Sequence, residues 1–488
     1  MRLIPPLRGH QIRVALGLTI LPLVISSLAG CAGAMRSYNA ESTSVLEHVR
    51  QGNVNQALAT LEAQNTSDDK DLLYFLEKGE LTRLRNDYLN SKASLLQADE
   101  KIRLWEEESK TNPDQLMGLI GSVIVNDKVR RYDGQDYEKV MASTRLAMTH
   151  LALGDLASAR TEIKKTHERE AIIQEYRDKE YAKVEEQAKE KGQQATFKDL
   201  KGYPVETLED PEVLALKNGY QNAFSHYLAG FVYESLGEPS LAAPGYRKAI
   251  ELRPNVKLLE EGLSQLEQRM ANKNDGLADT LFVIETGTIP GRESVTVPLP
   301  IPTASGLVVA PISFPVIRST REGTQNLGLR TSSTAIDLAE AVNFDAMARR
   351  CLRDEMPGII LRSTIRGALK GTLQHEINKR AGLVGGLLTA AVNVATEQAD
   401  ERAWRSLPNR VYLARARLAP GLQDVILQVD GIQRNVKVDL KPGPQLVNLR
   451  LAGNQLLLVQ PNTPYIEPKD NTALAKNTPP AANQEHQQ

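Results

Sequence analysis

The residues best suited to metal or acid-base chemistry do not have the spacing that such chemistry needs. His375-Glu376 begins a helical metalloprotease pattern, in which a second histidine four residues after the first completes the zinc site, but Lys379 occupies that position. The chain also lacks a Gly-x-Ser-x-Gly nucleophile elbow and a Gly-Lys-Ser/Thr phosphate-binding loop. Four further histidines lack ligand spacing and are predicted to have surface or packing roles: His48, His150, His167 and His226. The sequence therefore favours a protein that is not an enzyme and that uses no cofactor or metal.

The N-terminus has the pattern of an exported protein. Arg2, Arg8 and Arg13 precede an apolar run from Val14 to Leu28, and together they form the charged and apolar parts of a secretory signal. The run of about 15 residues falls short of the roughly 20 that a membrane-spanning helix needs. An uncleaved anchor helix is therefore disfavoured.

The apolar run leads into Leu28-Ala29-Gly30-Cys31, which resembles the lipobox of bacterial lipoprotein precursors. The resemblance implies a signal peptide at residues 1–30, acylation of Cys31 with fatty acids such as palmitate, and a lipidated linker at residues 31–41. An ordinary signal with an incidental cysteine is the alternative. Ala32 follows the cysteine where aspartate could stand, which by resemblance to enterobacterial sorting implies the outer membrane, facing the periplasm.

Composition indicates a large folded body behind this anchor. The 488 residues are 41% hydrophobic and provide room for two or three domains. Loss of the three signal arginines from the 59 basic residues leaves 56 basic against 60 acidic residues. Such a balance gives no general attraction to nucleic acid or to anionic lipid. With Cys31 assigned to lipid, Cys351 is a lone thiol, which we expect to be a buried small hydrophobe.

Residues 42–271 are predicted to form antiparallel helix pairs. In the clearest pair, which ends before Pro254, small and aromatic residues recur at Gly230, Tyr233, Gly237, Ala242 and Tyr246. The pattern resembles the tetratricopeptide repeat, a helix-turn-helix of about 34 residues. The small residues would let two helices approach, the tyrosines would fill the seam, Gly237 would form the turn and Pro254 would end the second helix. Weaker copies around two other glycines, Gly52 and Gly154, indicate a degenerate array.

A highly charged stretch from Ala157 to Gln194 departs from the repeat pattern. It contains few helix breakers, and its apolar residues recur at helical spacing, so it predicts one long helix. Its charges would form a solvated face, or the helix would project as a partner-binding arm.

Residues 277–461 are predicted to form a mixed α/β domain, so that the fold class is α+β. Between Val295 and Ile317 five prolines predict edge strands or extended loops. A separate strand is expected from Thr280 to Thr286. Four further strands at roughly ten-residue intervals predict a small antiparallel sheet or sandwich: Arg410 to Leu418, Asp424 to Val429, Asn435 to Leu440 and Gln445 to Leu451. Residues 462–488 have the composition of a disordered tail.

A helical insertion is expected between Ala335 and Ala403. Residues 381–395 carry no charge and contain Gly382 and Gly386, four residues apart, and Gly367 and Gly371 precede them at the same spacing. Small residues on one helix face permit close backbone contact. We therefore expect a glycine-rich helical hairpin, packed against the domain or facing the bilayer or another subunit.

The segment from Ala399 to Gly421 resembles a family of uncharacterised proteobacterial tetratricopeptide-repeat-containing outer-membrane lipoproteins. The residues that carry the resemblance are Ala399-Asp400, Arg402, Trp404-Arg405-Ser406-Leu407-Pro408 and Ala414-Arg415. The resemblance implies an outer-membrane lipoprotein, often encoded near a lipoprotein activator of penicillin-binding proteins. Locally, Trp404 and Pro408 are expected to fix the junction between helix and strand.

Two functions follow as hypotheses. In the first, the protein is a membrane-anchored periplasmic scaffold or adaptor that binds a periplasmic or outer-membrane protein in cell-envelope biogenesis, with peptidoglycan synthesis as the process. In the second, it is an envelope polysaccharide or glycan-binding or glycan-export factor. Aromatic residues make up only 5% of the chain and are concentrated in the helical half, which favours the scaffold.

Overall fold

Helices occupy the first half of the chain and strands dominate the second. The computed structural model describes residues 37–117, 130–190, 197–273, 275–303, 306–320, 325–367, 398–461 and 463–465. The chain is mixed α+β, 52% helical and 22% strand. The signal peptide, Cys31, most of the predicted tail and the glycine-rich stretch 381–395 lie outside the described residues.

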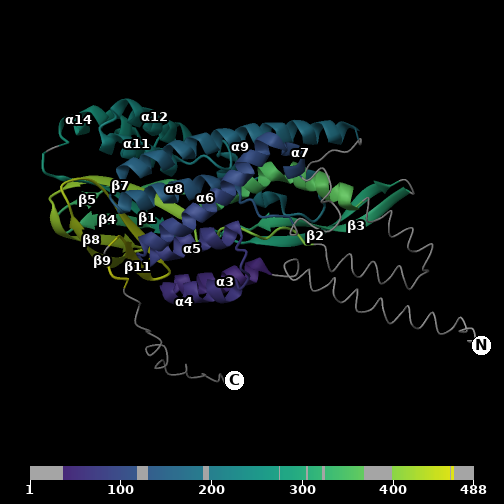
Figure 1. The fold of residues 1–488 in the computed structure, drawn as a ribbon, viewed down its shortest axis with the longest axis horizontal. Coiled ribbons are helices and arrows are strands. Elements are labelled where there is room, and N and C mark those ends of the chain that lie inside the picture. Colours follow the sequence, from purple (N-terminus) through teal and green to yellow (C-terminus); the bar gives the residue numbers. More distant parts are fainter. Residues whose placement is uncertain are drawn as a thin grey trace, which may run out of the picture.

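Consecutive helices pack in pairs, which in Figure 1 extend from α3 and α4 at the bottom to α11 and α12 at the top. Gly52, Gly154 and Gly237 have φ angles of +78°, +77° and +81° and follow helices at the predicted turns, where a left-handed residue satisfies the last carbonyls. The helices are α3 (Tyr38–Arg50), α4 (Val54–Gln64), α5 (Leu72–Leu84), α6 (Tyr88–Thr111), α7 (Pro113–Leu116), α8 (Asp136–Ala152), α9 (Leu156–Glu190), α10 (Pro211–Leu214), α11 (Ala223–Leu236), α12 (Pro239–Leu252), α13 (Lys257–Ser264) and α14 (Leu266–Ala271).

The strands form three sheets. The strands are β1 (Ala278–Thr286), β2 (Arg292–Thr303), β3 (Gly306–Ile317), β4 (Leu327–Thr331), β5 (Ala335–Ile336), β6 (Ala339–Asn343), β7 (Arg410–Leu418), β8 (Gly421–Val429), β9 (Ile432–Leu440), β10 (Gly443–Ala452) and β11 (Gln455–Val459). Their orders are β11-β10-β1-β7-β6, β2-β3 and β5-β4-β8-β9. The last four predicted strands exist but divide between two sheets, and β10 pairs with β1 in parallel. The prediction that these four strands form one small antiparallel sheet is therefore wrong, while the alternative of a sandwich stays a prediction.

The predicted helical insertion begins later than expected. Residues 335–343 form β5 and β6, and the helix occupies residues 344–367 of the described chain. Asn343 caps this helix, because its side-chain oxygen accepts the N–H of Ala346 at 3.2 Å. At the other end of the insertion, Ala403 is already in extended chain.

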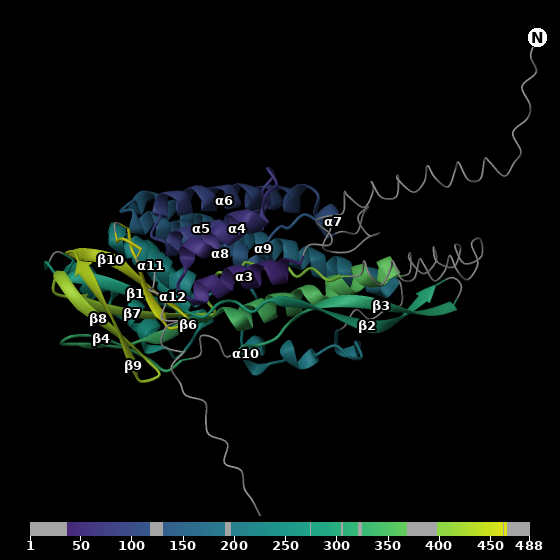
Figure 2. The same cartoon turned by 90° about the horizontal axis from the view of Figure 1, so that it is seen from below.

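Three long elements run beside one another away from the five-stranded and four-stranded sheets. Helix α9, the helix of residues 344–367 and the β2–β3 hairpin extend toward the same end of the molecule (Figures 1 and 2). Helix α9 is not a free arm, since Ile163, Ile173 and Tyr176 are buried against neighbouring elements. Its charges are not all solvated either, because Arg169 and Glu170 are buried.

The helical and strand halves share one core. A single cluster of buried apolar residues contains Leu76 of α5, Phe224 of α11, Leu281 of β1 and Trp404. This cluster therefore extends across the boundary that composition predicts near residue 272, while a second apolar cluster lies within the strand half alone.

A buried ion-pair cluster crosses this core. Arg83 of α5 contacts Glu80 at 2.7 Å and Glu285 of β1 at 2.8 Å, and Arg145 of α8 pairs with both carboxylates. Arg450 of β10 lies 3.7 Å from Glu285 and donates to the carbonyl of Gly287. These charges are removed from water, so each must be balanced by an opposite charge within the cluster. The ion pairs therefore join helices α5 and α8 to the five-stranded sheet.

Candidate functional site

An open cleft of about 820 Å³ lies where α8 and α9 meet the base of the β2–β3 hairpin and the helix of residues 344–367. It is lined mainly by charged and aromatic side chains from both halves of the chain. Among them are Trp105, Arg131, Asp133, Asp136, Lys139, Tyr176, Arg177, Glu180, Arg292, Glu355, Arg362 and Asp400. Sequence analysis did not predict this cleft, because the residues named here come from six separated segments.

Arg177 is the centre of the cleft floor. Its guanidinium contacts Asp136 at 2.6 Å, Glu180 at 2.6 Å and Glu355 at 3.0 Å. Glu355 also pairs with Arg292 at 3.2 Å. Burial raises the pKa of Asp136, but the charges of Arg177 and Lys139 outweigh burial and lower it overall. The floor thus holds alternating fixed charges from four elements.

Two aromatic rings form one wall of the cleft. Trp105 of α6 and Tyr176 of α9 pack edge to face with their centroids 5.4 Å apart. The Lys139 ammonium lies 3.9 Å from the centroid of Trp105, and so it covers one face of the indole. Both rings are buried, so they shape the wall but do not present an open stacking surface.

Two buried glutamates position the segment that closes the cleft. Glu138 of α8 accepts the backbone N–H of Trp404 at 2.7 Å, and Glu77 of α5 accepts that of Arg405 at 2.7 Å. Burial raises the pKa of Glu138, and it raises that of Glu77 to about 7. The segment that contains Trp404 and Arg405 is therefore held by side chains from the helical half. Within it, Arg402 pairs with Asp400 at 2.8 Å, and Trp404 is fully buried.

A second hollow of about 840 Å³ adjoins the cleft, and Asp136 and Arg177 line both. Cys351 lines it, yet the thiol is buried and lies 3.4 Å from a Glu355 carboxylate oxygen. Burial raises the pKa of this thiol well above its usual range. Cys351 is thus held as a neutral thiol.

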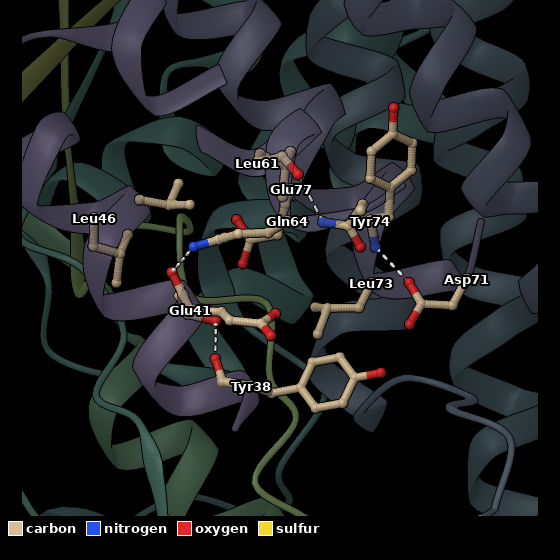
Figure 3. A pocket seen from close by; sticks show the side chains of 12 residues that line it. Tyr38, Glu41, Leu46, Leu61, Gln64, Asp71, Leu73, Tyr74 and Glu77 are labelled. Atoms are coloured by element: carbon tan, nitrogen blue, oxygen red, sulfur yellow. Dashed lines mark hydrogen bonds between the residues drawn. The ribbon is translucent and has the colours of Figure 1, made fainter. Parts of the chain in front are cut away.

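A smaller hollow of about 420 Å³ lies between α3, α4 and α5 (Figure 3). Leucines from the three helices form its apolar wall, and Glu77 reaches it from α5. The side chain of Gln64 spans one side and donates to the carbonyl of Glu41 at 3.4 Å. Tyr38 and Asp71 stand at its rim.

The residues predicted to pack the helix pair converge between α11 and α12. The ring of Tyr246 lies against Gly230, where an added Cβ would come within 2.6 Å of it, and Ala242 is fully buried. Tyr233 is buried, Gly237 caps α11, and α12 ends at Leu252, two residues before Pro254.

Sequence reasoning missed two residues of this seam. Gly245 lies so close to α11 that an added Cβ would be 2.7 Å from the Gly230 nitrogen. Arg415 of β7 contacts Glu234 at 2.9 Å and Asp279 at 2.5 Å. The four-residue spacing of helix contacts before Ala249 could have indicated Gly245, whereas no local pattern indicates the partners of Arg415.

The helical histidines are placed by packing. His226 stacks on His167 of α9 with centroids 5.1 Å apart and an interplanar angle of 10°, and it lies 3.1 Å from Glu170. His226 is therefore fixed by contacts with α9. His150 is buried at the end of α8. His375, Glu376 and Lys379 lie outside the described residues.

Within the described ranges, no group of three or more His, Cys, Asp or Glu side chains is arranged to hold a metal ion. Of the helices that the structure describes, none has the length and apolarity to cross a membrane. Comparison with known protein families, curated proteins and solved structures gave no match.

Proposed function

We propose that the protein is a membrane-anchored periplasmic scaffold that binds a protein partner in cell-envelope biogenesis, with the charged cleft as its binding surface. In this proposal the helix pairs form a degenerate tetratricopeptide-like array. Acylated Cys31 holds the body at the outer membrane, and peptidoglycan synthesis is the process that the partner serves. The resemblance of the segment from Ala399 to Gly421 to outer-membrane lipoproteins supports this assignment.

The observation that carries the proposal is the placement of the cleft across the joint between the two halves. The shared core and the cluster around Glu285 hold both walls in fixed relative positions. A partner segment in the cleft would contact helices α8 and α9 and the hairpin base together. A preorganised surface of this kind loses little entropy on binding, which is what a scaffold requires.

The chemistry of the cleft suits a polypeptide partner. Arginine is one of the residues that most often dominate protein-protein binding energy, and Arg131, Arg177 and Arg362 line this cleft. Basic and acidic groups alternate along it, so the best ligand carries charges of both signs. The glycan alternative needs an open aromatic face for a sugar ring, and the Trp105 and Tyr176 rings are buried.

Site-specific photo-cross-linking in cells tests the scaffold proposal. A photoreactive residue at Arg131, on the rim of the cleft, is expected to give discrete adducts with an envelope protein. The same residue at Lys437, exposed on β9, serves as the matched control and should give none. Adducts of equal pattern at both positions, or glycan without protein at position 131, would contradict the proposal.

The anchor is tested separately by Cys31→Ser. The substitution removes the thiol that would carry the acyl groups, so we expect an unprocessed precursor and loss of the protein from the outer-membrane fraction. Processing and membrane extraction identical to the unaltered protein would contradict lipidation.

A further inference from the structure

The β2–β3 hairpin carries no charged residue beyond Arg292 and Glu293, the first two residues of β2. Charged residues make up 24% of the chain, yet none occurs from Ser294 to Ile317, between Glu293 and Arg318. The two strands pair only with each other among the described residues. The hairpin extends away from the five-stranded sheet toward one end of the molecule (Figure 2).

The inner face of the hairpin is accounted for by packing. Val297, Ile301 and Ile312 are buried, and they meet the end of the helix of residues 344–367. At Gly367 an added Cβ would lie 2.3 Å from the Ile301 Cδ1 atom. This side of the hairpin therefore belongs to the core.

The outer face is apolar and uncovered. Pro298 pairs with Pro311 and Pro300 pairs with Val309, so these four side chains form one continuous patch across the two strands. All four are exposed, and Val309 keeps 63% of its surface accessible. Contiguous exposed apolar patches mark surfaces that contact a membrane, another protein or a ligand.

The prolines also remove hydrogen-bond donors from the strand edges. Proline fits in a ladder only where its nitrogen points away from the partner strand, so Pro298, Pro300 and Pro311 leave gaps among the donors along the open edges. Addition of a further strand from a second copy is thereby disfavoured. A strand edge with few unpaired N–H groups is instead suited to contact with hydrocarbon, because each unpaired N–H costs several kcal/mol there.

The base of the hairpin lies beside the start of the described chain. An added Cβ at Gly291, one residue before β2, would lie 2.5 Å from Asn39 Oδ1 in the first turn of α3. Eight residues separate Asn39 from Cys31, a span of at most about 29 Å. Strand β2 has 12 residues and is about 40 Å long. A lipid group on Cys31 therefore attaches the body close to the hairpin.

We propose that the outer face of the β2–β3 hairpin, formed by Pro298, Pro300, Val309 and Pro311, rests on the lipid bilayer to which the chain is anchored. The inference rests on the membrane anchorage of the proposed function. The contact is apolar and independent of headgroup charge, because the hairpin has no charged side chain from Ser294 to Ile317. It adds a second membrane attachment and fixes the orientation of the body, so that the charged cleft at the hairpin base is held near the bilayer surface.

Tryptophan fluorescence on tethered vesicles tests this contact. The mature chain from residue 32 carries an N-terminal histidine tag and is bound to phosphatidylcholine vesicles containing nickel-chelating lipid and brominated acyl chains. The tag replaces the acyl group, so the result does not depend on acylation of Cys31. Val309→Trp places the probe in the patch, and Ile432→Trp is the matched control, because Ile432 is 62% exposed on another hairpin. The native tryptophans, Trp105 and Trp404, are buried and give a constant background.

In the Val309→Trp protein we expect a blue shift on vesicles and loss of roughly half of the added emission to the brominated chains, as for a residue within the outer 5–10 Å of the bilayer. The Ile432→Trp protein should show neither change. Equal quenching at both positions, or none at position 309, would overturn the inference. So would a blue shift without vesicles that grows with protein concentration, since a second copy would then cover the patch. Quenching at position 309 together with normal localisation of Cys31→Ser would retain the hairpin contact and reject the acyl anchor.

Discussion

Glu285 illustrates how single charged residues control this fold. Burial alone would raise the pKa of its carboxyl group, but the guanidinium groups of Arg145 and Arg83 lower it to about 2. Burial lowers the pKa of the neighbouring Arg450. The cluster therefore depends on its carboxylates, and it leaves one guanidinium only weakly paired.

Replacing Glu285 with Gln should lower the free energy of unfolding by about 3–5 kcal/mol, because buried guanidinium groups lose their counter-charge. The stabilisation of the folded state by the ionised Glu285 carboxylate is complete above pH 4.5 and is lost as the pH falls toward 2. The difference in stability between the unaltered protein and Glu285→Gln should therefore shrink in acid. Urea unfolding at pH 7 and pH 3 measures both effects. Glu100→Gln, which breaks an exposed pair with Arg103, is the control and should cost less than about 1 kcal/mol. Equal losses for the two variants would contradict this role of Glu285.

Glu77 titrates in the opposite sense. Its pKa of about 7 exceeds the ordinary value of 4.5, so between these values the folded chain retains a proton that the unfolded chain releases. Stability should therefore fall as the pH rises from 4.5 to 7, by on the order of 3 kcal/mol from this group, and then level off. Glu77→Gln, which keeps an acceptor for the Arg405 N–H, should remove that part of the slope in urea titrations at pH 5, 6 and 7. Glu47→Gln, at an exposed carboxylate, should leave the slope unchanged. A Glu77→Gln protein with the slope of the unaltered chain would refute the assignment.

The helix pair α11–α12 shows what a short pattern can and cannot predict at the level of elements. Glycine and tyrosine spacing predicted the turn at Gly237 and the seam around Tyr246, because these contacts recur every three or four residues. Strand positions from Arg410 onward followed from alternation and turn residues, and they agree within a few residues. Sheet membership did not follow, since the β1–β10 pairing joins segments more than 160 residues apart. The cleft was beyond sequence reasoning for the same reason.

Gly245→Ala should separate these two helices. The new Cβ would lie 2.7 Å from the Gly230 nitrogen and 2.9 Å from the His226 carbonyl oxygen, and backbone atoms cannot rotate away. We expect a loss of about 1–3 kcal/mol despite the better helix propensity of alanine. Gly328→Ala is the matched substitution, because its Cβ would meet Gln428 at an ordinary 3.7 Å. Thermal unfolding of both variants measures the difference, and a Gly245→Ala protein as stable as Gly328→Ala would show that the seam can relax.

At the scale of the whole molecule, the helical and strand halves should behave as one cooperative unit. Their common core includes Trp404, which is tied to α8 through the Glu138 carboxylate, while Trp105 lies within the helical half. Composition predicted two folding regions because it registers the change from helix to strand. It cannot register which faces are buried against each other.

Single-tryptophan variants test this cooperativity. In Trp105→Phe, the fluorescence of Trp404 reports the junction, and its urea midpoint should coincide with loss of the helical circular dichroism signal. Trp404→Phe, which reports Trp105, should give coincident transitions as well and controls for the substitution itself. Separate midpoints in the Trp105→Phe protein alone would indicate that the halves unfold independently.

The ion cluster also constrains the order in which the chain can complete its structure. Arg83 is synthesised 202 residues before Glu285 and 365 residues before Asn448, which accepts from its guanidinium at 2.6 Å. Until those later segments are synthesised, the Arg83 guanidinium stays hydrated, whereas in the folded protein it is buried. The inner face of helix α5 therefore cannot pack before then. The first helices made are therefore among the last to reach their final packing. A nascent chain lacking β10 should remain sensitive to proteases at its oldest end.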